Sequence, residues 1–131
     1  MARVTLPRVR HWTLDEARAA LPEVRAVVKR VRALVAAARA RRDRQEATPS
    51  GNGQTPAAGE AEAELRAALA QLTDQGIIVR DPARGLIDFP AVSPTGRDYL
   101  LCWVDGEDTI EWWHFPEDGF AGRTPLTEPP A

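Results

Sequence analysis

The sequence predicts an α+β fold, in which an N-terminal helical hairpin packs on a C-terminal four-stranded antiparallel β-meander. Apolar residues recur every three or four positions in the first half of the chain, which is the period of a helix face. After Gly76 the pattern changes to short runs of β-branched and aromatic residues separated by turn sequences. The length of 131 residues is typical of one domain, which we expect to comprise residues 1–131.

The first element is a long, basic helix in residues 1–47, expected to begin at Thr13 and to end near Glu46. Thr13 and Glu16 have the spacing of a capping box, in which each side chain accepts a hydrogen bond from the other residue's backbone N–H. Apolar side chains follow at helical spacing: Leu21, Val24, Val28, Val31, Val35 and Ala38. Pro22 predicts a kink or a break, because proline lacks the N–H that a helix interior uses.

A flexible loop and a second helix come next. Residues 48–59 are rich in glycine, proline and small polar residues, which bury little surface and are typical of flexible segments. In residues 60–75 alanine and leucine return at helical spacing, and Gly76 is a common stop signal. We expect the two helices to pack antiparallel. Because the first is longer, part of its apolar face needs the sheet or a second subunit as partner.

The sheet is expected within residues 76–116, followed by an ordered loop and a tail in residues 117–131. The segments between the strands are short and contain the Asp, Gly, Pro and Ser residues that are typical of hairpin turns. The strands themselves are predicted at 77–80, 86–92, 97–104 and 109–115.

The register of these strands decides which side chains share a face of the sheet. If the second and third turns each contain four residues, Val92 faces Arg97 and Val104 faces Thr109. One face is then the candidate site face: Leu86, Asp88, Tyr99, Leu101, Trp103, Ile110, Trp112 and His114. The other is the core face: Ile87, Phe89, Ala91, Leu100, Cys102, Val104, Trp113 and Phe115, with Glu111 as the lone charge, expected to pair with a helix arginine. A slip of one residue would exchange the faces of a strand.

The predicted site is centred on His114, near the end of the last strand. Its ring is a candidate metal ligand or general acid/base, because histidine changes charge near neutral pH. Asp88 and Glu117 are the predicted carboxylate ligands of the same metal, and Tyr99, opposite His114 in this register, is the second candidate catalytic residue. The structural alternative is that His114 only stacks among tryptophans and donates to a backbone carbonyl.

Three more side chains are predicted to bind a small anionic ligand. Arg123 would clamp its charge, and Trp103 and Trp112 would line the pocket. The cofactor is unknown from the sequence. Should it be a divalent metal, iron, manganese or magnesium is expected rather than a zinc ion held by cysteines, because the chain has one cysteine and must supply mostly carboxylates.

The charges of the chain are divided between its two parts. Residues 1–47 hold twelve of the seventeen lysines and arginines and carry a net charge of +7, whereas residues 48–131 carry −9. We interpret this division as attraction between the halves, within one chain or between subunits. A nucleic-acid surface is disfavoured, because the basic cluster of the first helix lacks interleaved aromatic residues. No apolar stretch of about 18 residues predicts a membrane span, so we expect a cytosolic protein.

Several motifs of the chain occur in the order found in a known family: His11 to Ala17, Leu21 to Glu23, Gly76, Gly85 to Pro90, Leu101 to Trp103, Trp113-His114 and Gly119 to Arg123. With these motifs the chain resembles a bacterial family catalogued as a domain of unknown function, family twenty-two oh three. The resemblance covers nearly the whole chain and implies a single cytosolic domain. It brings no activity to transfer.

Functions from different classes therefore remain open. The favoured one is binding of a metal ion or a small anionic ligand around His114, with or without catalysis. The rival is a non-catalytic homo-oligomeric module, in which the excess length of the first helix pairs with a second copy. Nucleic-acid binding through the basic helix is the least favoured.

Overall fold

The structure, a computed structural model, describes residues 10–47 and 56–131. Its elements are, in chain order, α1 (Leu14–Ala47), α2 (Pro56–Thr73), β1 (Ile78–Asp81), β2 (Leu86–Val92), β3 (Asp98–Val104), β4 (Trp112–His114), the 3₁₀ helix η1 (Phe120–Gly122) and β5 (Thr124–Pro125). Every pair of neighbouring strands is antiparallel, which confirms the α+β class. The sheet has five strands, in the order β1-β2-β3-β4-β5, and not the four expected.

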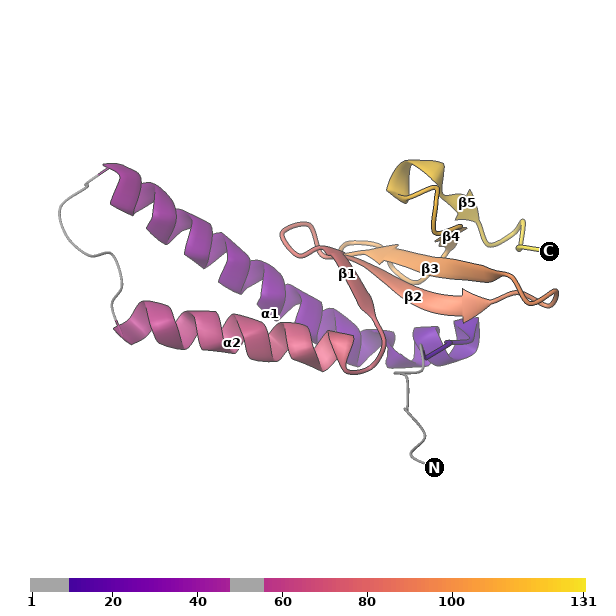
Figure 1. The fold of residues 1–131 in the computed structure, drawn as a ribbon, viewed down its shortest axis with the longest axis horizontal. Helices are drawn as coiled ribbons and strands as arrows, with labels where there is room; N and C mark the ends of the chain where they lie inside the picture. Colours follow the sequence, from indigo (N-terminus) through magenta and orange to yellow (C-terminus); the bar gives the residue numbers. More distant parts are fainter. Residues whose placement is uncertain (1–9, 48–55) are drawn as a thin grey trace, which may run out of the picture.

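The two helices lie close to their predicted bounds. α2 begins at Pro56 rather than Glu60, so the last part of the expected flexible loop is helical. The rest of that loop, residues 48–55, lies outside the described residues. α1 and α2 run side by side in opposite directions and project beyond one end of the sheet (Figure 1). No helix in the described ranges is long and apolar enough to cross a membrane.

The capping box predicted at the start of α1 is present. The Thr13 N–H donates to Oε1 of Glu16 (3.0 Å), and the Glu16 N–H donates to Oγ1 of Thr13 (3.1 Å). The bond from the Thr13 backbone contributes most to lowering the pKa of Glu16. Pro22 does not break α1, which continues to Ala47. The ribbon bends in the N-terminal third, which contains this proline, as expected for a kink (Figure 1).

Thr13→Ala is expected to lower the free energy of unfolding by about 1 kcal/mol, the usual cost of losing an N-cap hydroxyl. Urea unfolding at neutral pH measures the change, and Thr13→Ser, which keeps the hydroxyl, is the control. Because the pKa of Glu16 is lowered from 4.5 in the folded protein, its carboxylate stabilises the fold above that pH. This stabilisation is lost as the pH falls through the lowered pKa. Equal stability of both variants would contradict a role for the cap.

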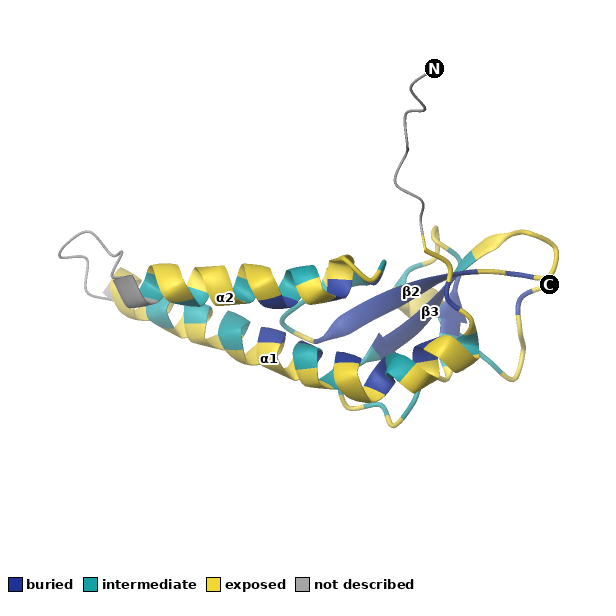
Figure 2. Cartoon of the chain, turned by 90° about the horizontal axis from the view of Figure 1, so that it is seen from below, coloured by how far each residue is buried: buried dark blue, intermediate teal, exposed yellow. Residues whose placement is uncertain are grey.

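The helices cover one face of the sheet, and the C-terminal segment covers part of the other. The core cluster joins side chains of both helices and of the sheet: Val24, Val28, Val31, Ala68, Leu72, Ile87, Phe89, Ala91, Leu101 and Trp103. Pro116 and Phe120 line a cavity on the opposite face. Figure 2 therefore shows β2 and β3 as almost wholly buried, while the outward turns of α1 and α2 are exposed.

The predicted register is wrong by one residue at the first of its two hairpins. Val92 pairs with Asp98 rather than with Arg97. The reason is the turn, because Ser93 and Arg97 continue the ladder through a bond from the Ser93 N–H to the Arg97 oxygen (2.9 Å). The loop is thus residues 94–96, and its last residue is a glycine with a φ of +85°, which suits a three-residue hairpin loop.

The next hairpin is displaced by one residue as well. His114 pairs with Leu100 rather than with Tyr99. The two errors cancel between the outer strands, so β4 keeps its predicted position relative to β2 and only β3 has moved. Its faces are therefore exchanged: Tyr99 and Trp103 lie on the core face, and Cys102 lies on the candidate site face.

Basic side chains of α1 contact the acidic part of the chain. Arg32 Nη1 lies 2.7 Å from Oδ2 of Asp105, whose side chain is only 7% exposed. Arg30 pairs with Glu64 of α2 at 3.3 Å. The charge division of the sequence thus agrees with attraction within one chain.

Candidate metal centre

Three buried side chains with metal-binding atoms meet on the sheet face opposite the helices. Asp88 of β2 pairs with Cys102 of β3, and His114 of β4 lies one ladder step further along the same face. Their exposed fractions are 0%, 1% and 3%. One ligand atom from each lies within 4.8 Å of the others. The structure thus brings together Asp88 and His114, as predicted, and adds Cys102, which the sequence analysis placed in the core.

The two hydrogen bonds of the His114 ring define its state. Nδ1 lies 2.8 Å from the backbone oxygen of Phe115, which can only accept, so Nδ1 carries a proton and donates it. Nε2 lies 3.1 Å from Oδ1 of Asp88. In a neutral ring Nε2 has a lone pair. Two buried acceptors at this distance need a cation between them, either a proton or a metal ion.

Arg80, which is not among the residues predicted from the sequence, binds the other oxygen of Asp88. Its Nε donates to Oδ2 at 2.8 Å, which leaves Oδ1 facing His114. Arg80 is the extra residue where the β1–β2 register shifts between Val79 and Asp81. Such a bulge changes the direction in which a side chain points, and bulges are common beside functional sites. Nothing in the local sequence marks this bulge, because it depends on the pairing with β2.

Cys102 is a protonated thiol at neutral pH. Burial, reinforced by the Asp88 carboxylate, raises the pKa of Cys102 to about 12. A thiol with this pKa is a poor nucleophile. In a nucleophilic triad, moreover, one ring nitrogen faces the nucleophile and the other a carboxylate, whereas Nδ1 of His114 is bonded to a backbone carbonyl. The arrangement therefore fits metal ligation, in which the metal displaces the thiol proton, better than thiol catalysis.

Alkylation of Cys102 by iodoacetamide near pH 8 is expected to be about 1,000-fold slower in the folded protein than in urea, because only the thiolate reacts and a pKa near 12 leaves about 1,000-fold less of it. Intact-protein mass spectrometry measures both rates, and the single cysteine makes the assignment unambiguous. Similar rates in the two states would contradict the buried, protonated thiol.

A small cavity of about 140 Å³ lies beside the three ligand side chains. Its lining residues come from the sheet and from the C-terminal segment: Arg80, Leu86, Asp88, Cys102, His114, Pro116, Gly119 and Phe120. Gly119 has a φ of 65°, a conformation that favours glycine, directly before Phe120. A second hollow of about 310 Å³ also borders Arg80 and Pro116, so the two spaces are neighbours.

Two of the predicted site residues lie on the wrong side of the sheet for contact with this cavity. Tyr99 packs against the core, and burial raises its pKa. Trp103 is fully buried, and its Nε1–H donates to the backbone oxygen of Glu107 (3.0 Å). Both were expected beside His114. The shift of β3 by one residue explains both errors.

The remaining predicted residues are engaged elsewhere. Glu117 is an exposed residue that pairs with Arg97 at 3.1 Å, so it is not among the buried ligand atoms. Arg123 Nη2 donates to both carboxylate oxygens of Glu107 (2.8 and 2.7 Å). Its guanidinium also lies over the ring of Trp112, 4.8 Å from the centroid. The predicted anion clamp therefore already binds a carboxylate of the protein.

Comparison with known proteins identifies a family but no chemistry. A family model described as "Uncharacterized conserved protein (DUF2203)" matches residues 10–126. The match confirms the family resemblance and includes Asp88, Cys102 and His114. No curated protein and no solved structure matches the chain.

Proposed function

The chain belongs to the uncharacterised conserved family DUF2203, and we propose that this member binds a divalent metal ion through Asp88, Cys102 and His114. One observation carries the proposal. Nε2 of His114 and Oδ1 of Asp88 lie 3.1 Å apart in a buried site, while Nδ1 donates to a backbone carbonyl. Two acceptor atoms thus face each other across a space that a proton or a metal ion can fill, with the sulfur of Cys102 as a third donor nearby.

The partners of the ligands support the same proposal. A histidine that binds a metal usually donates its other N–H to a carbonyl or carboxylate, as His114 does to Phe115. A carboxylate ligand is usually oriented by a hydrogen bond, as Asp88 is by Arg80. These contacts hold the donor atoms in place before any ion arrives.

The donor set favours zinc. Zinc accepts imidazole, thiolate and carboxylate ligands together, whereas magnesium and manganese prefer oxygen ligands. From the sequence, iron, manganese or magnesium is the expected ion, because a chain with one cysteine must supply mostly carboxylates. With the sulfur among the donors, iron is the main competitor of zinc.

The cavity favours a site that acts on a ligand rather than a purely structural one. Three protein ligands leave a coordination position for water or substrate, as in catalytic zinc sites. In the described part of the chain Arg80 donates only through Nε, so its terminal nitrogens are available to a ligand in the cavity. We propose that the ligand is small and anionic, that Arg80 binds its charge, and that the metal polarises it.

Titration with Co²⁺ tests the metal site directly. Cobalt replaces zinc in sites of this kind, and a cysteine ligand produces a charge-transfer absorption in the near ultraviolet. We expect this band in the wild-type protein and its loss on addition of Zn²⁺. Cys102→Ser should remove the band, because no other cysteine is present.

Elemental analysis of the purified protein identifies the native ion. Zinc at one equivalent would support the proposal in full, and iron would support the site but change the ion. A wild-type protein that shows no cobalt band, and that Zn²⁺ does not stabilise against heat, would overturn the proposal.

The projecting ends of the helices favour assembly as a second candidate function. α1 and α2 extend beyond the sheet, where the end of α1 is rich in arginine and the start of α2 in glutamate (Figure 1). Opposite charges could pair an antiparallel second copy with this surface. Across the described residues, however, the exposed large hydrophobic side chains are Val92 and Phe120, neither of them in a helix of this projection. Sedimentation velocity tests whether the protein self-associates. A monomer at all concentrations would contradict the assembly function.

A further inference from the structure

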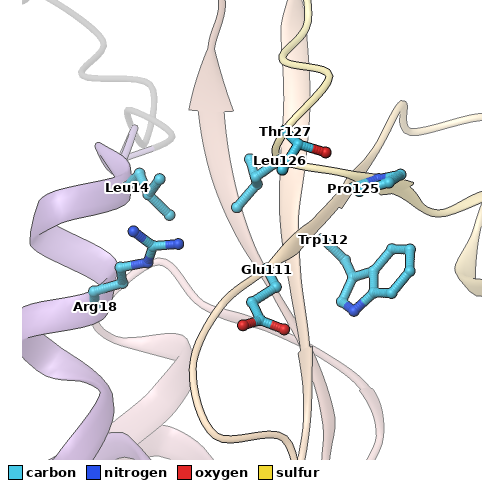
Figure 3. Close-up of a pocket in the computed structure, with 7 residues that line it drawn as sticks. All are labelled: Leu14, Arg18, Glu111, Trp112, Pro125, Leu126 and Thr127. Atoms are coloured by element: carbon cyan, nitrogen blue, oxygen red, sulfur yellow. The ribbon is translucent and has the colours of Figure 1, made fainter.

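A larger cavity lies at a different place, between the start of α1 and the C-terminal strands. Its volume is about 510 Å³, within the range of about 300–1,000 Å³ that small-molecule sites occupy. The side chains that matter here are Leu14, Arg18, Glu111, Trp112, Pro125 and Leu126. In Figure 3, Leu14 and Arg18 project from α1 on one side, and Glu111, Trp112 and Pro125 lie across from them.

Arg18 is held in place at the wall of this cavity. Its Nε and Nη2 both donate to the backbone oxygen of Ile110, at 3.2 and 2.8 Å. This pair of bonds fixes the plane of the guanidinium and leaves Nη1 without a protein partner among the described residues. A fixed guanidinium with a free N–H suits a carboxylate ligand, because little side-chain freedom remains to be lost on binding.

Glu111 supplies the opposite charge without neutralising Arg18. A helix arginine is the partner that the sequence predicts for it, but in the described part of the chain no cation lies within 4.0 Å of its carboxylate, and the residue is exposed. Its backbone is fixed, because its oxygen accepts a bond from the Leu126 N–H (2.9 Å). The carboxylate is therefore an open acceptor on a residue whose backbone is fixed.

The rest of the wall is mostly apolar. Trp112 belongs to β4, where it pairs with Pro125 of β5, and the Arg123 guanidinium lies 4.8 Å from the centroid of its ring. Leu14 and Leu126 add aliphatic surface. An apolar group of a ligand could pack here while its polar groups reach the two charges.

We infer that this cavity binds a small zwitterion with an apolar side chain, a free amino acid or a short peptide. The ammonium group binds Glu111, the carboxylate binds Arg18, and the side chain packs against Trp112 and the leucines. Arg18 would repel a ligand that carries only a positive charge, and Glu111 would repel one that carries only a negative charge. The cavity therefore favours a ligand that carries both charges. The inference does not depend on the metal site.

Calorimetric titration with four compounds tests the inference: L-leucine, the dipeptide leucyl-leucine, N-acetyl-L-leucine and L-leucinamide. We expect binding of L-leucine or of leucyl-leucine, and the stronger of the two distinguishes an amino acid from a peptide. N-acetyl-L-leucine lacks the ammonium group and L-leucinamide lacks the carboxylate. Each should bind at least about tenfold more weakly, since each loses a charge-assisted contact.

Glu111→Gln is the matching protein variant, because the residue is exposed and the change keeps its size. It should weaken binding of the zwitterion about tenfold and strengthen the weak binding of N-acetyl-L-leucine, because the carboxylate of that anion no longer meets a negative charge. Glu23→Gln, an exposed position on α1 outside the cavity, should behave as wild type. Absence of binding by both zwitterions, or equal binding to wild type and Glu111→Gln, would overturn the inference.

Discussion

His114→Ala is expected to weaken the binding of Zn²⁺ and Co²⁺ by more than about 100-fold. Removing a residue that only hydrogen-bonds to a metal ligand lowers the metal affinity about 10–100-fold, and this variant removes a ligand atom itself. Competition with a chromophoric chelator measures the affinity. His11→Ala is the matched control, because His11 is the other histidine of the chain and contacts Asp98 at the surface (3.2 Å).

Equal affinities of wild type, His114→Ala and His11→Ala would mean that the ion binds elsewhere, on exposed carboxylates. A loss of affinity in His114→Ala together with a cobalt–thiolate band that persists at saturating Co²⁺ would show that Cys102 still binds the ion after the His114 ligand is removed. The two measurements therefore test the ligands one at a time.

Asp88→Ala is expected to lower the free energy of unfolding of the metal-free protein by about 2–3 kcal/mol, the usual cost of losing a buried hydrogen-bonded charge whose partner stays partly exposed. The Asp88 carboxylate accepts from Arg80 (2.8 Å) and faces His114 (3.1 Å), and it is fully buried. Without it, the buried His114 ring loses the partner of Nε2, and Arg80, whose side chain is 44% exposed, loses a charge-assisted hydrogen bond. Urea unfolding in the presence of a chelator measures the loss.

The surface pair of His11 and Asp98 is the control for this experiment. Its carboxylate is 73% exposed, and exposed ion pairs contribute about 0–1 kcal/mol. Asp98→Ala should therefore leave the stability nearly unchanged. If Asp88→Ala is just as harmless, the buried contacts of Asp88 do not stabilise the fold.

Together the two variants separate a metal site from a structural ion pair. A large loss of stability in Asp88→Ala, with no metal bound by the wild type, would assign the cluster to the fold and reject the proposed function. Metal binding that depends on both Asp88 and His114 would support the function whatever the stability of the apo protein.

Features that depend on near neighbours in the chain could be predicted. The capping box of Thr13 and Glu16, the start of α1 and the positions of β2 and β3 all agree with the structure to within a few residues. Each depends on contacts within a turn or on the alternation of a single strand. Contacts between distant elements could not be predicted in this way. The arginine partner expected for Glu111 belongs to a helix, and the structure does not pair the two.

The relation between Asp88 and His114 was predicted correctly even though the strand between them was misplaced. The first turn moves β3 by one residue, and the second turn moves β4 back relative to β3, so the outer strands keep their predicted relation. Gly96 is the signal that could have corrected the first turn, since a glycine at this position is typical of three-residue hairpin loops.

By itself the sequence determines the α+β class, the capped helix and the placement of Asp88 and His114 on one face of the sheet. Only the tertiary structure decides that Cys102 joins them, that the bulge brings Arg80 to Asp88, and that Arg123 is already paired. The physical reason is the period of two in a strand. One residue more or less in a turn moves a side chain from the core to the site, and no local preference of β3 opposes that exchange.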